Sequence, residues 1–116
     1  MSDKHSKQKD YMQMALAEAE KAATAGEVPV GAVLVAADGT VLAAMGNAMR
    51  QAHDATAHAE MRVIRAACAA LSNERLTDCD LYVTLEPCPM CAGAIAEARI
   101  RRVYYGAADI KGGAVD

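Results

Sequence analysis

One segment constrains the fold of this chain more than any other. Residues 28–35, Val-Pro-Val-Gly-Ala-Val-Leu-Val, are apolar with almost no alternation between polar and apolar side chains. A strand with one face in water alternates the two kinds, so this run predicts a strand buried on both faces. Such a strand needs helices on both sides of its sheet, which favours an α/β fold.

The remaining elements extend that prediction. Asp38-Gly39 is typical of a hairpin turn. Further strands are expected over residues 40–45, 80–85 and 101–106, and helices over residues 8–25, 58–71 and 89–98. The order of these elements predicts a single domain, residues 1–116, with a mixed four-stranded sheet between helices. Thr56 is the predicted N-cap of the second helix.

The first helix is predicted to bury an apolar face. That face consists of Tyr11, Met14, Ala15, Leu16, Ala19 and Ala22. Residues 1–7 are polar and are expected to form a frayed tail. Residues 107–116 are expected to be irregular.

The core that these elements can build is small. The chain has 116 residues, of which 27 are Ala, and it contains neither Phe nor Trp. This length supports one domain, and small side chains leave little margin of stability. A partner subunit or a bound metal would add to it.

Several classes of protein are excluded. No apolar run approaches the ~20 residues of a membrane span, and the charged first ten residues do not form a secretory signal. A net charge of −3 argues against a general polyanion binder. Four cysteines are too few for a disulfide framework, so we expect a cytoplasmic protein with reduced thiols. In that setting, a close cysteine pair indicates metal or redox chemistry.

The close pair lies in Pro87-Cys88-Pro89-Met90-Cys91, at the start of a predicted helix. Residues three apart in a helix share a face, so both sulfur atoms can point at one site. The positive end of the helix favours thiolates, and two thiolates suit Zn²⁺. Pro89 fits the first turn, where a backbone N–H is not needed.

A second segment, His58-Ala59-Glu60, opens another predicted helix. His58 is a suitable third ligand, and three protein ligands leave one position of a tetrahedral zinc site open. Water at such a position has a lowered pKa and can attack as hydroxide. Glu60 is therefore predicted to carry protons beside the metal rather than to bind it.

Two other classes stay open on these residues alone. A Cys-x-x-Cys pair at a helix start also occurs in thioredoxin-like redox centres, although that leaves His58-Ala59-Glu60 unexplained. A structural zinc module is the other alternative, with Cys79 or His53 as its fourth ligand.

Both motifs resemble those of the zinc-dependent cytidine/deoxycytidylate deaminase superfamily. Within it, the chain is most similar to the bacterial tRNA-specific adenosine deaminases, which convert adenosine to inosine at the anticodon wobble position. The resemblance covers nearly the whole chain. It is carried by residues 28–35, 47, 53–54, 56–60, 83–95, 102–107 and 109–114.

The resemblance implies a three-layer α/β/α cytidine deaminase-like fold, with a mixed central sheet of four to five strands flanked by helices. It implies one Zn²⁺ per chain, held by His58, Cys88 and Cys91. Glu60 is implied to be the general acid/base in a hydrolytic deamination.

The resemblance also implies how the substrate is bound. Asn47 is implied to hydrogen-bond the target base, and the backbone N–H groups near Ala59 and Cys88 to face the substrate. The implied partners are a tRNA anticodon stem-loop and a second copy of the chain in a homodimer. Family members continue with a further strand and a helix that contact the tRNA, and this part of the usual domain is expected to be absent. Deamination of a free base, nucleoside or nucleotide, such as guanine, cytosine or deoxycytidylate, remains an alternative.

A tRNA substrate needs a basic surface despite the net charge of −3. The sequence has two basic clusters, Lys4, Lys7 and Lys9, and Arg99, Arg101 and Arg102. Both a tRNA contact and an ordinary solvated surface remain open for each cluster.

Overall fold

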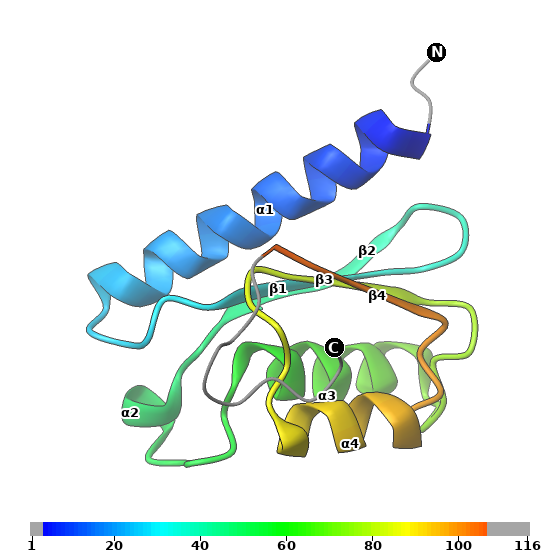
Figure 1. The fold of residues 1–116 in the computed structure, drawn as a ribbon. Coiled ribbons are helices and arrows are strands. Elements are labelled where there is room, and N and C mark those ends of the chain that lie inside the picture. The colour runs from blue at the N-terminus through cyan, green and yellow to red at the C-terminus, as the bar shows by residue number, and fades with distance from the viewer. Residues whose placement is uncertain (1–3, 107–116) are drawn as a thin grey trace.

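The computed structural model describes residues 4–106 of the chain. Four helices and four strands make up this part (Figure 1). In chain order they are α1 (Lys4–Thr24), β1 (Gly31–Val35), β2 (Val41–Gly46), α2 (Met49–Ala52), α3 (Ala59–Leu71), β3 (Asp80–Val83), α4 (Pro89–Glu97) and β4 (Arg102–Tyr105). The irregular segment expected over residues 107–116 lies outside the described residues. None of the helices within residues 4–106 is long and apolar enough to cross a membrane.

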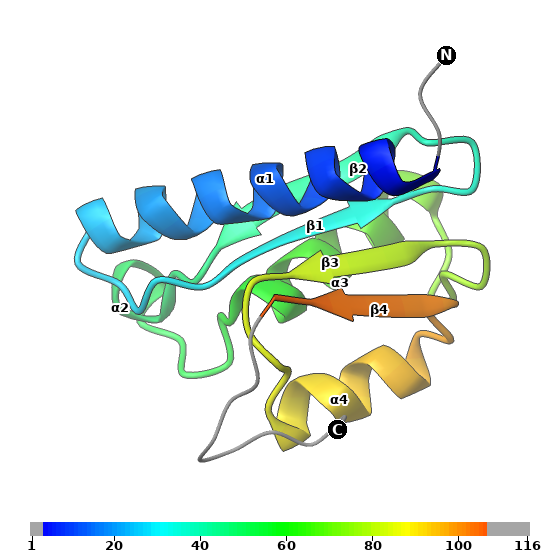
Figure 2. The same cartoon turned by 45° about the horizontal axis from the view of Figure 1, so that its top comes forward.

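The four strands form one mixed sheet in the order β2-β1-β3-β4. β1 pairs antiparallel with both β2 and β3, and β3 pairs parallel with β4. Helix α1 covers one face of the sheet, and α3 and α4 cover the other (Figures 1 and 2). The predicted three-layer arrangement with a mixed four-stranded sheet is therefore confirmed.

β1 occupies a central position, and all five of its residues are buried. Ala32 and Leu34 belong to the core cluster that includes Val63 of α3, whereas Val33 and Val35 pack in a second cluster with Ala15 of α1. Alternate side chains thus enter two different cores, which is why the strand shows no polar face.

The strand is shorter than the sequence predicts, because it begins at Gly31 rather than at Val28. Pro29 has no N–H for a sheet ladder, and the N–H of Val30 donates to the carbonyl of Val28 at 2.9 Å in a tight turn. Val28 is consequently 54% exposed.

Helix α1 lies very close to the sheet. A Cβ atom on Gly31 would overlap the carbonyl oxygen of Ala15, and one on Gly46 would lie 2.7 Å from the carbonyl oxygen of Glu18. Glycine at these two positions therefore lets the helix backbone approach β1 and β2 directly. The facing side chains on α1 must be correspondingly small.

Two predictions about α1 are wrong. Its buried face is formed by the small side chains of Ala15, Ala19 and Ala22, whereas Met14 and Leu16 are 38% and 44% exposed. The helix also begins at Lys4, so residues 4–7 belong to it rather than to a frayed tail. No Gly or Pro interrupts the chain between Lys4 and Thr24, and most of these residues favour a helix.

The segment between β2 and α3, for which the sequence predicts no helix or strand, contains the short helix α2. This helix ends at His53, whose φ of 51° is left-handed. The N-cap of α3 is His58 and not Thr56. The Thr56 hydroxyl instead donates to Asp54 Oδ1 at 2.7 Å, within a turn that precedes the helix.

Two leucine variants test this packing. Leu34→Ala removes a fully buried side chain of β1 and is expected to lower the free energy of unfolding by about 2–5 kcal/mol. Leu16→Ala makes the same change on the exposed side of α1 and is expected to cost less than about 1 kcal/mol. Denaturant unfolding measures both values, and equal costs would contradict the described position of Leu16.

Candidate functional site

Two helices begin at the same place in the molecule, and their first residues carry the motifs. His58 is the N-cap of α3, and its carbonyl accepts the N–H of Arg62 at 3.0 Å. Cys88 is the N-cap of α4, followed by Pro89 in the first turn. Both caps have extended backbone, so their side chains lie at the open ends of the helices.

The three predicted metal ligands are brought together. His58 Nδ1 lies 3.6 Å from Cys88 Sγ and 3.4 Å from Cys91 Sγ. All three donor atoms lie within 4.8 Å of one another. Around a tetrahedral zinc ion, a nitrogen and a sulfur ligand are about 3.5 Å apart. The donor types and their spacing therefore fit one zinc ion.

The cluster of His58, Cys88 and Cys91 is the only group of three or more possible ligands found among the described side chains. Neither Cys79 nor His53 belongs to it. Cys79 is buried in the core beneath α3, and His53 is exposed at the end of α2. Among the described side chains the cluster has three ligands, and three protein ligands are the number found in catalytic zinc sites.

The electrostatics of the cluster favour a cation. Burial raises the pKa of the Cys91 thiol, and the nearby Glu60 and Cys88 raise it further. Burial also raises the pKa of the Glu60 carboxyl, while the Glu60 backbone N–H and the charge of His58 partly oppose that rise. Acidic groups gathered in a buried place need a positive charge to ionise, and a divalent metal supplies it.

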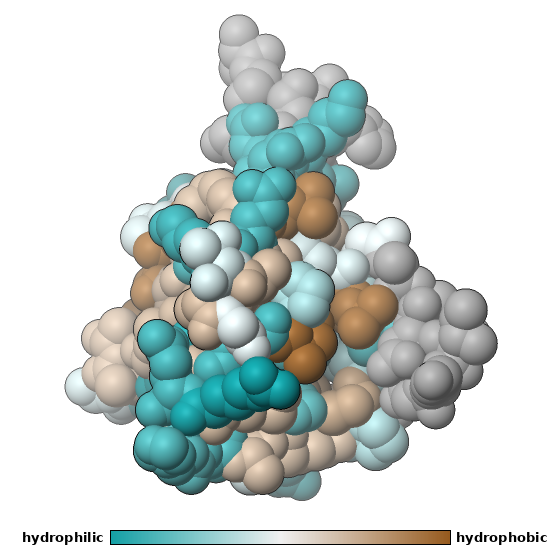
Figure 3. Space-filling model, turned by 90° about the vertical axis from the view of Figure 1, so that its left-hand side faces the viewer, coloured by the Kyte–Doolittle hydropathy of each residue, from teal (hydrophilic) through white to brown (hydrophobic). Residues whose placement is uncertain are grey.

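A cavity of about 180 Å³ adjoins the cluster. We call it the active-site pocket. Its lining consists of Val28, Val30, Asn47, Met49, His58, Glu60, Leu85, Glu86 and Cys88. Such a mixture of apolar walls and a few polar groups is typical of small-molecule sites, and its small volume suits a single ring system. The end of the molecule that carries α2 shows small hydrophobic groups set among hydrophilic ones (Figure 3).

Glu60 lies in the first turn of α3 and is only 4% exposed. Its carboxyl and the Cys91 thiol influence each other's pKa, so Glu60 lies beside the metal ligands. The position agrees with the prediction from the sequence that Glu60 carries protons beside the metal. Its role in catalysis stays a prediction.

Asn47 follows β2 directly and is buried. Its backbone N–H donates to the carbonyl of Val30 at 3.0 Å, and its side-chain Oδ1 accepts the N–H of Ala59 at 2.7 Å. The two predicted substrate-binding groups are therefore neighbours that bind each other. The Ala59 N–H is already engaged, which leaves the amide nitrogen of Asn47 as the donor available to a ligand.

Several lining residues were not identified from the sequence. Met49 reaches the pocket because α2 folds back from β2, and no local signal marks that turn. Glu86 is 3% exposed and lines the pocket. The only signal for Glu86 is that it comes directly before Pro87-Cys88.

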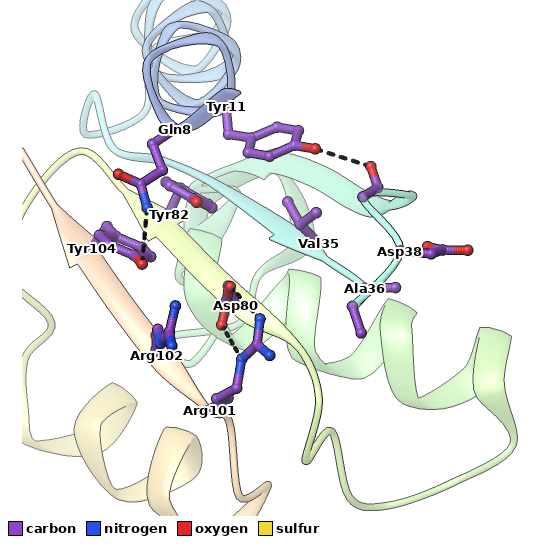
Figure 4. Close-up of a pocket in the computed structure, with 12 residues that line it drawn as sticks. Gln8, Tyr11, Val35, Ala36, Asp38, Asp80, Tyr82, Arg101, Arg102 and Tyr104 are labelled. Carbon is purple, nitrogen blue, oxygen red and sulfur yellow. Dashed lines mark hydrogen bonds and ion pairs between the residues drawn. The ribbon is translucent and has the colours of Figure 1, made fainter. Parts of the chain in front are cut away.

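A larger cavity, of about 330 Å³, lies beside α1 over β3 and β4 (Figure 4). Gln8 Nε2 donates to the hydroxyl of Tyr104 at 3.1 Å, and Arg101 forms two hydrogen bonds to Asp80 at 3.0 and 2.9 Å. The rings of Tyr82 and Tyr104 stack with their centroids 4.7 Å apart. None of the predicted site residues lines this cavity, and Arg101 is held by an acidic neighbour.

Comparisons with known proteins agree with a zinc site in this chain. The family model of the cytidine and deoxycytidylate deaminase zinc-binding region matches residues 5–107. The tRNA-specific adenosine deaminase of Agrobacterium fabrum is 62% identical over 106 residues, which are 91% of this chain and 69% of that protein.

Two solved structures superpose closely. One comes from biochemical and structural studies of A-to-I editing by tRNA:A34 deaminases at the wobble position of transfer RNA. It has a TM-score of 0.90 and 62% identity over 92% of this chain and 77% of that chain. The guanine deaminase of Bacillus subtilis has a TM-score of 0.83 and 42% identity over 86% of this chain and 64% of that chain. The chain thus spans between 64% and 77% of the length of these three proteins.

The metal site is testable by cysteine substitution. Cys88→Ser and Cys91→Ser each remove a thiolate and are expected to lower bound zinc well below one ion per chain. Cys68→Ser is the matched control, because Cys68 lies on α3 outside the cluster, and its zinc content is expected to be unchanged. Elemental analysis after dialysis measures the metal. Full zinc in Cys91→Ser, or loss of zinc in Cys68→Ser, would contradict this assignment.

Proposed function

This chain belongs to the cytidine and deoxycytidylate deaminase family, and we propose that it deaminates adenosine at the wobble position of tRNA to inosine by zinc-dependent hydrolysis. The observation that carries the proposal is the cluster of His58, Cys88 and Cys91 with Glu60 buried beside it. The tRNA substrate is supported by the similar tRNA-specific adenosine deaminase and the similar tRNA:A34 deaminase structure.

In this proposal His58, Cys88 and Cys91 hold the metal, one ion per chain. When bound, zinc supplies Lewis acidity that lowers the pKa of a neighbouring water. Glu60 takes a proton from that water as its oxygen attacks C6 of the adenine ring. Glu60 gives that proton to the adjacent ring nitrogen, takes a second proton from the hydroxyl group now on C6, and gives it to the amino group as the C6–N bond breaks. Adenosine and water thereby become inosine and ammonia.

Burial suits Glu60 to this task. A carboxyl whose pKa is raised by burial accepts a proton more readily than an exposed one, and it can return that proton in the next step. The two helix N-termini that meet here favour the negative charge that Glu60 carries between transfers.

Asn47 is proposed to orient the base. Its Oδ1 is held by the Ala59 N–H, which fixes the plane of the amide and directs its nitrogen as a donor. The backbone of Ala59 then acts mainly by holding Asn47.

Deamination of a free base is the second candidate, and the similarity to guanine deaminase supports it. The pocket is small enough for a base alone, and the family motif is shared. A structural zinc module is less well supported, because it leaves the buried Glu60 without a role.

We also propose a homodimer. Four of the five exposed residues of α4 are uncharged, namely Pro89, Met90, Gly93 and Ala96, and the fifth is Glu97 at the end of the helix. A surface depleted of charge is typical of the centre of a protein interface. The mass of the protein in solution measures this directly.

A cytoplasmic location completes the proposal. All four cysteines are free thiols, as expected in a reducing compartment.

A substrate panel tests the reaction. We expect ammonia release from an anticodon stem-loop with adenosine at the wobble position, and little release from adenine, guanine, cytosine or cytidine. The expected product in the stem-loop is inosine, which mass spectrometry of the digested RNA identifies. Release from free bases or cytidine alone would reject the tRNA substrate and retain a deaminase, whereas no release from any substrate would reject the enzyme.

Glu60→Ala tests the proton carrier. Loss of a general acid/base is expected to lower kcat by about 100-fold or more. Zinc content is expected to stay at one ion per chain, since Glu60 is not a ligand. Glu74→Ala changes an exposed glutamate and is expected to leave kcat unchanged. A near-normal rate in Glu60→Ala would remove Glu60 from the mechanism.

A further inference from the structure

Glu27 is a buried carboxylate that the reaction described above does not use. It lies between α1 and β1 and is 6% exposed. Its Oε1 accepts the backbone N–H of Arg50 at 3.1 Å, and its Oε2 accepts that of Gln51 at 2.9 Å. Both donors belong to α2, which is 23 and 24 residues further along the chain.

These bonds replace a cap that α2 lacks. The N-cap of α2 is Ala48, which has no side chain able to bind the first N–H groups of the helix. Without Glu27, two backbone donors at a crowded turn would lose their partners. The N–H groups of Gln51 and Arg50 hold the pKa of Glu27 below its usual range, and the positive charges of Arg50 and Arg62 add to this effect. The carboxylate is therefore ionised at neutral pH, which strengthens both bonds.

The segment that Glu27 holds consists of α2 and the two residues before it, and it forms part of the lining of the active-site pocket. Asn47 and Met49 line that pocket, and Asn47 binds Ala59 at the start of α3. Asn47 and Ala48 are also held by the bonds from Asn47 N–H to Val30 and from Ala48 N–H to Ala57, at 3.0 and 2.9 Å. Both of those bonds precede α2. Glu27 instead binds α2 itself, through the N–H groups of Arg50 and Gln51.

Glu27 is itself firmly placed. Its backbone N–H donates to the carbonyl of Ala22 at the end of α1, at 2.9 Å. Two residues that follow it, Val28 and Val30, line the same pocket. The Glu27 side chain thus links two segments of the chain that both contribute to the pocket lining.

We propose that Glu27 is a positioning residue for the deamination, which sets Asn47 and Met49 against the base by capping α2. The inference rests on the proposed function and goes beyond it in assigning a role to a residue outside the metal cluster. Glu27 touches neither the metal ligands nor the reacting atoms, so it acts only through α2.

Two substitutions at Glu27, one milder than the other, test its role as a positioning residue. Glu27→Gln keeps one acceptor oxygen but turns an amide NH₂ toward the other N–H, and Glu27→Ala removes both acceptors. Because misplaced groups in an active site cost up to about 100-fold, we expect kcat/KM on the stem-loop to fall about 10- to 100-fold in Glu27→Ala and less in Glu27→Gln. A rise in KM is expected to account for much of the loss. Zinc content is expected to be unchanged.

A purely structural role predicts a different pattern. If Glu27 only stabilises the fold, then both variants will have normal kcat/KM at a temperature well below their unfolding transitions. That result would overturn the proposal. Glu20→Ala, an exposed glutamate on α1, is the matched control and is expected to match the unaltered protein.

A second measurement does not depend on activity. Amide hydrogen exchange by NMR is expected to speed up at Arg50 and Gln51 in both variants, and the side-chain amide resonances of Asn47 are expected to move. Unchanged exchange at Arg50 and Gln51, or unmoved Asn47 resonances, would overturn the link between Glu27 and the pocket. If the unaltered protein deaminates none of the substrates, the proposed function fails, and this measurement still decides whether Glu27 sets the position of Asn47.

Discussion

Burial of β1 on both faces is the constraint on which the rest of the structure depends. One set of its side chains packs with α3, and the alternate set packs with α1. Each helix therefore has a fixed place relative to the same strand. At Gly31 the contact with α1 is so close that the backbones themselves meet. With few large side chains available, the chain gains its packing from short distances between elements rather than from bulky residues.

The same strand determines where the site forms. Because β1 runs antiparallel to β2 and β3, its start lies beside the ends of both. Asn47 leaves the end of β2, and the loop that carries Cys88 leaves the end of β3. Ligand sites in open α/β sheets commonly lie outside the carboxyl ends of strands. Here that edge also receives the N-termini of α3 and α4, so the metal-ligand cluster, the Glu60 carboxyl and the positive helix ends meet at one place.

Residues whose role is local could be predicted from the sequence, and those whose role depends on distant partners could not. The spacing of Cys88 and Cys91 on one helix turn is a local signal, and His58 is marked by its neighbour Glu60. Glu27 is not marked, because its partners are 23 and 24 residues away and are backbone groups that no residue type reveals. Leu16 was misplaced for a related reason, since helical periodicity cannot show that α1 lies too close to the sheet to admit a leucine.

The acidic groups of this chain suit the chemistry of the pocket but give the chain little general attraction for RNA. The pocket and the adjoining cluster gather Glu60, Glu86 and the thiols of Cys88 and Cys91, and the net charge of the chain is −3. A stem-loop therefore gains little from the overall field and must be bound through local contacts. In the predicted cluster of Arg99, Arg101 and Arg102, the charge of Arg101 is paired with that of Asp80, whereas Arg102 is exposed. For the proposed substrate, we expect most of the selectivity to come from the base in the pocket that Asn47 and Met49 line.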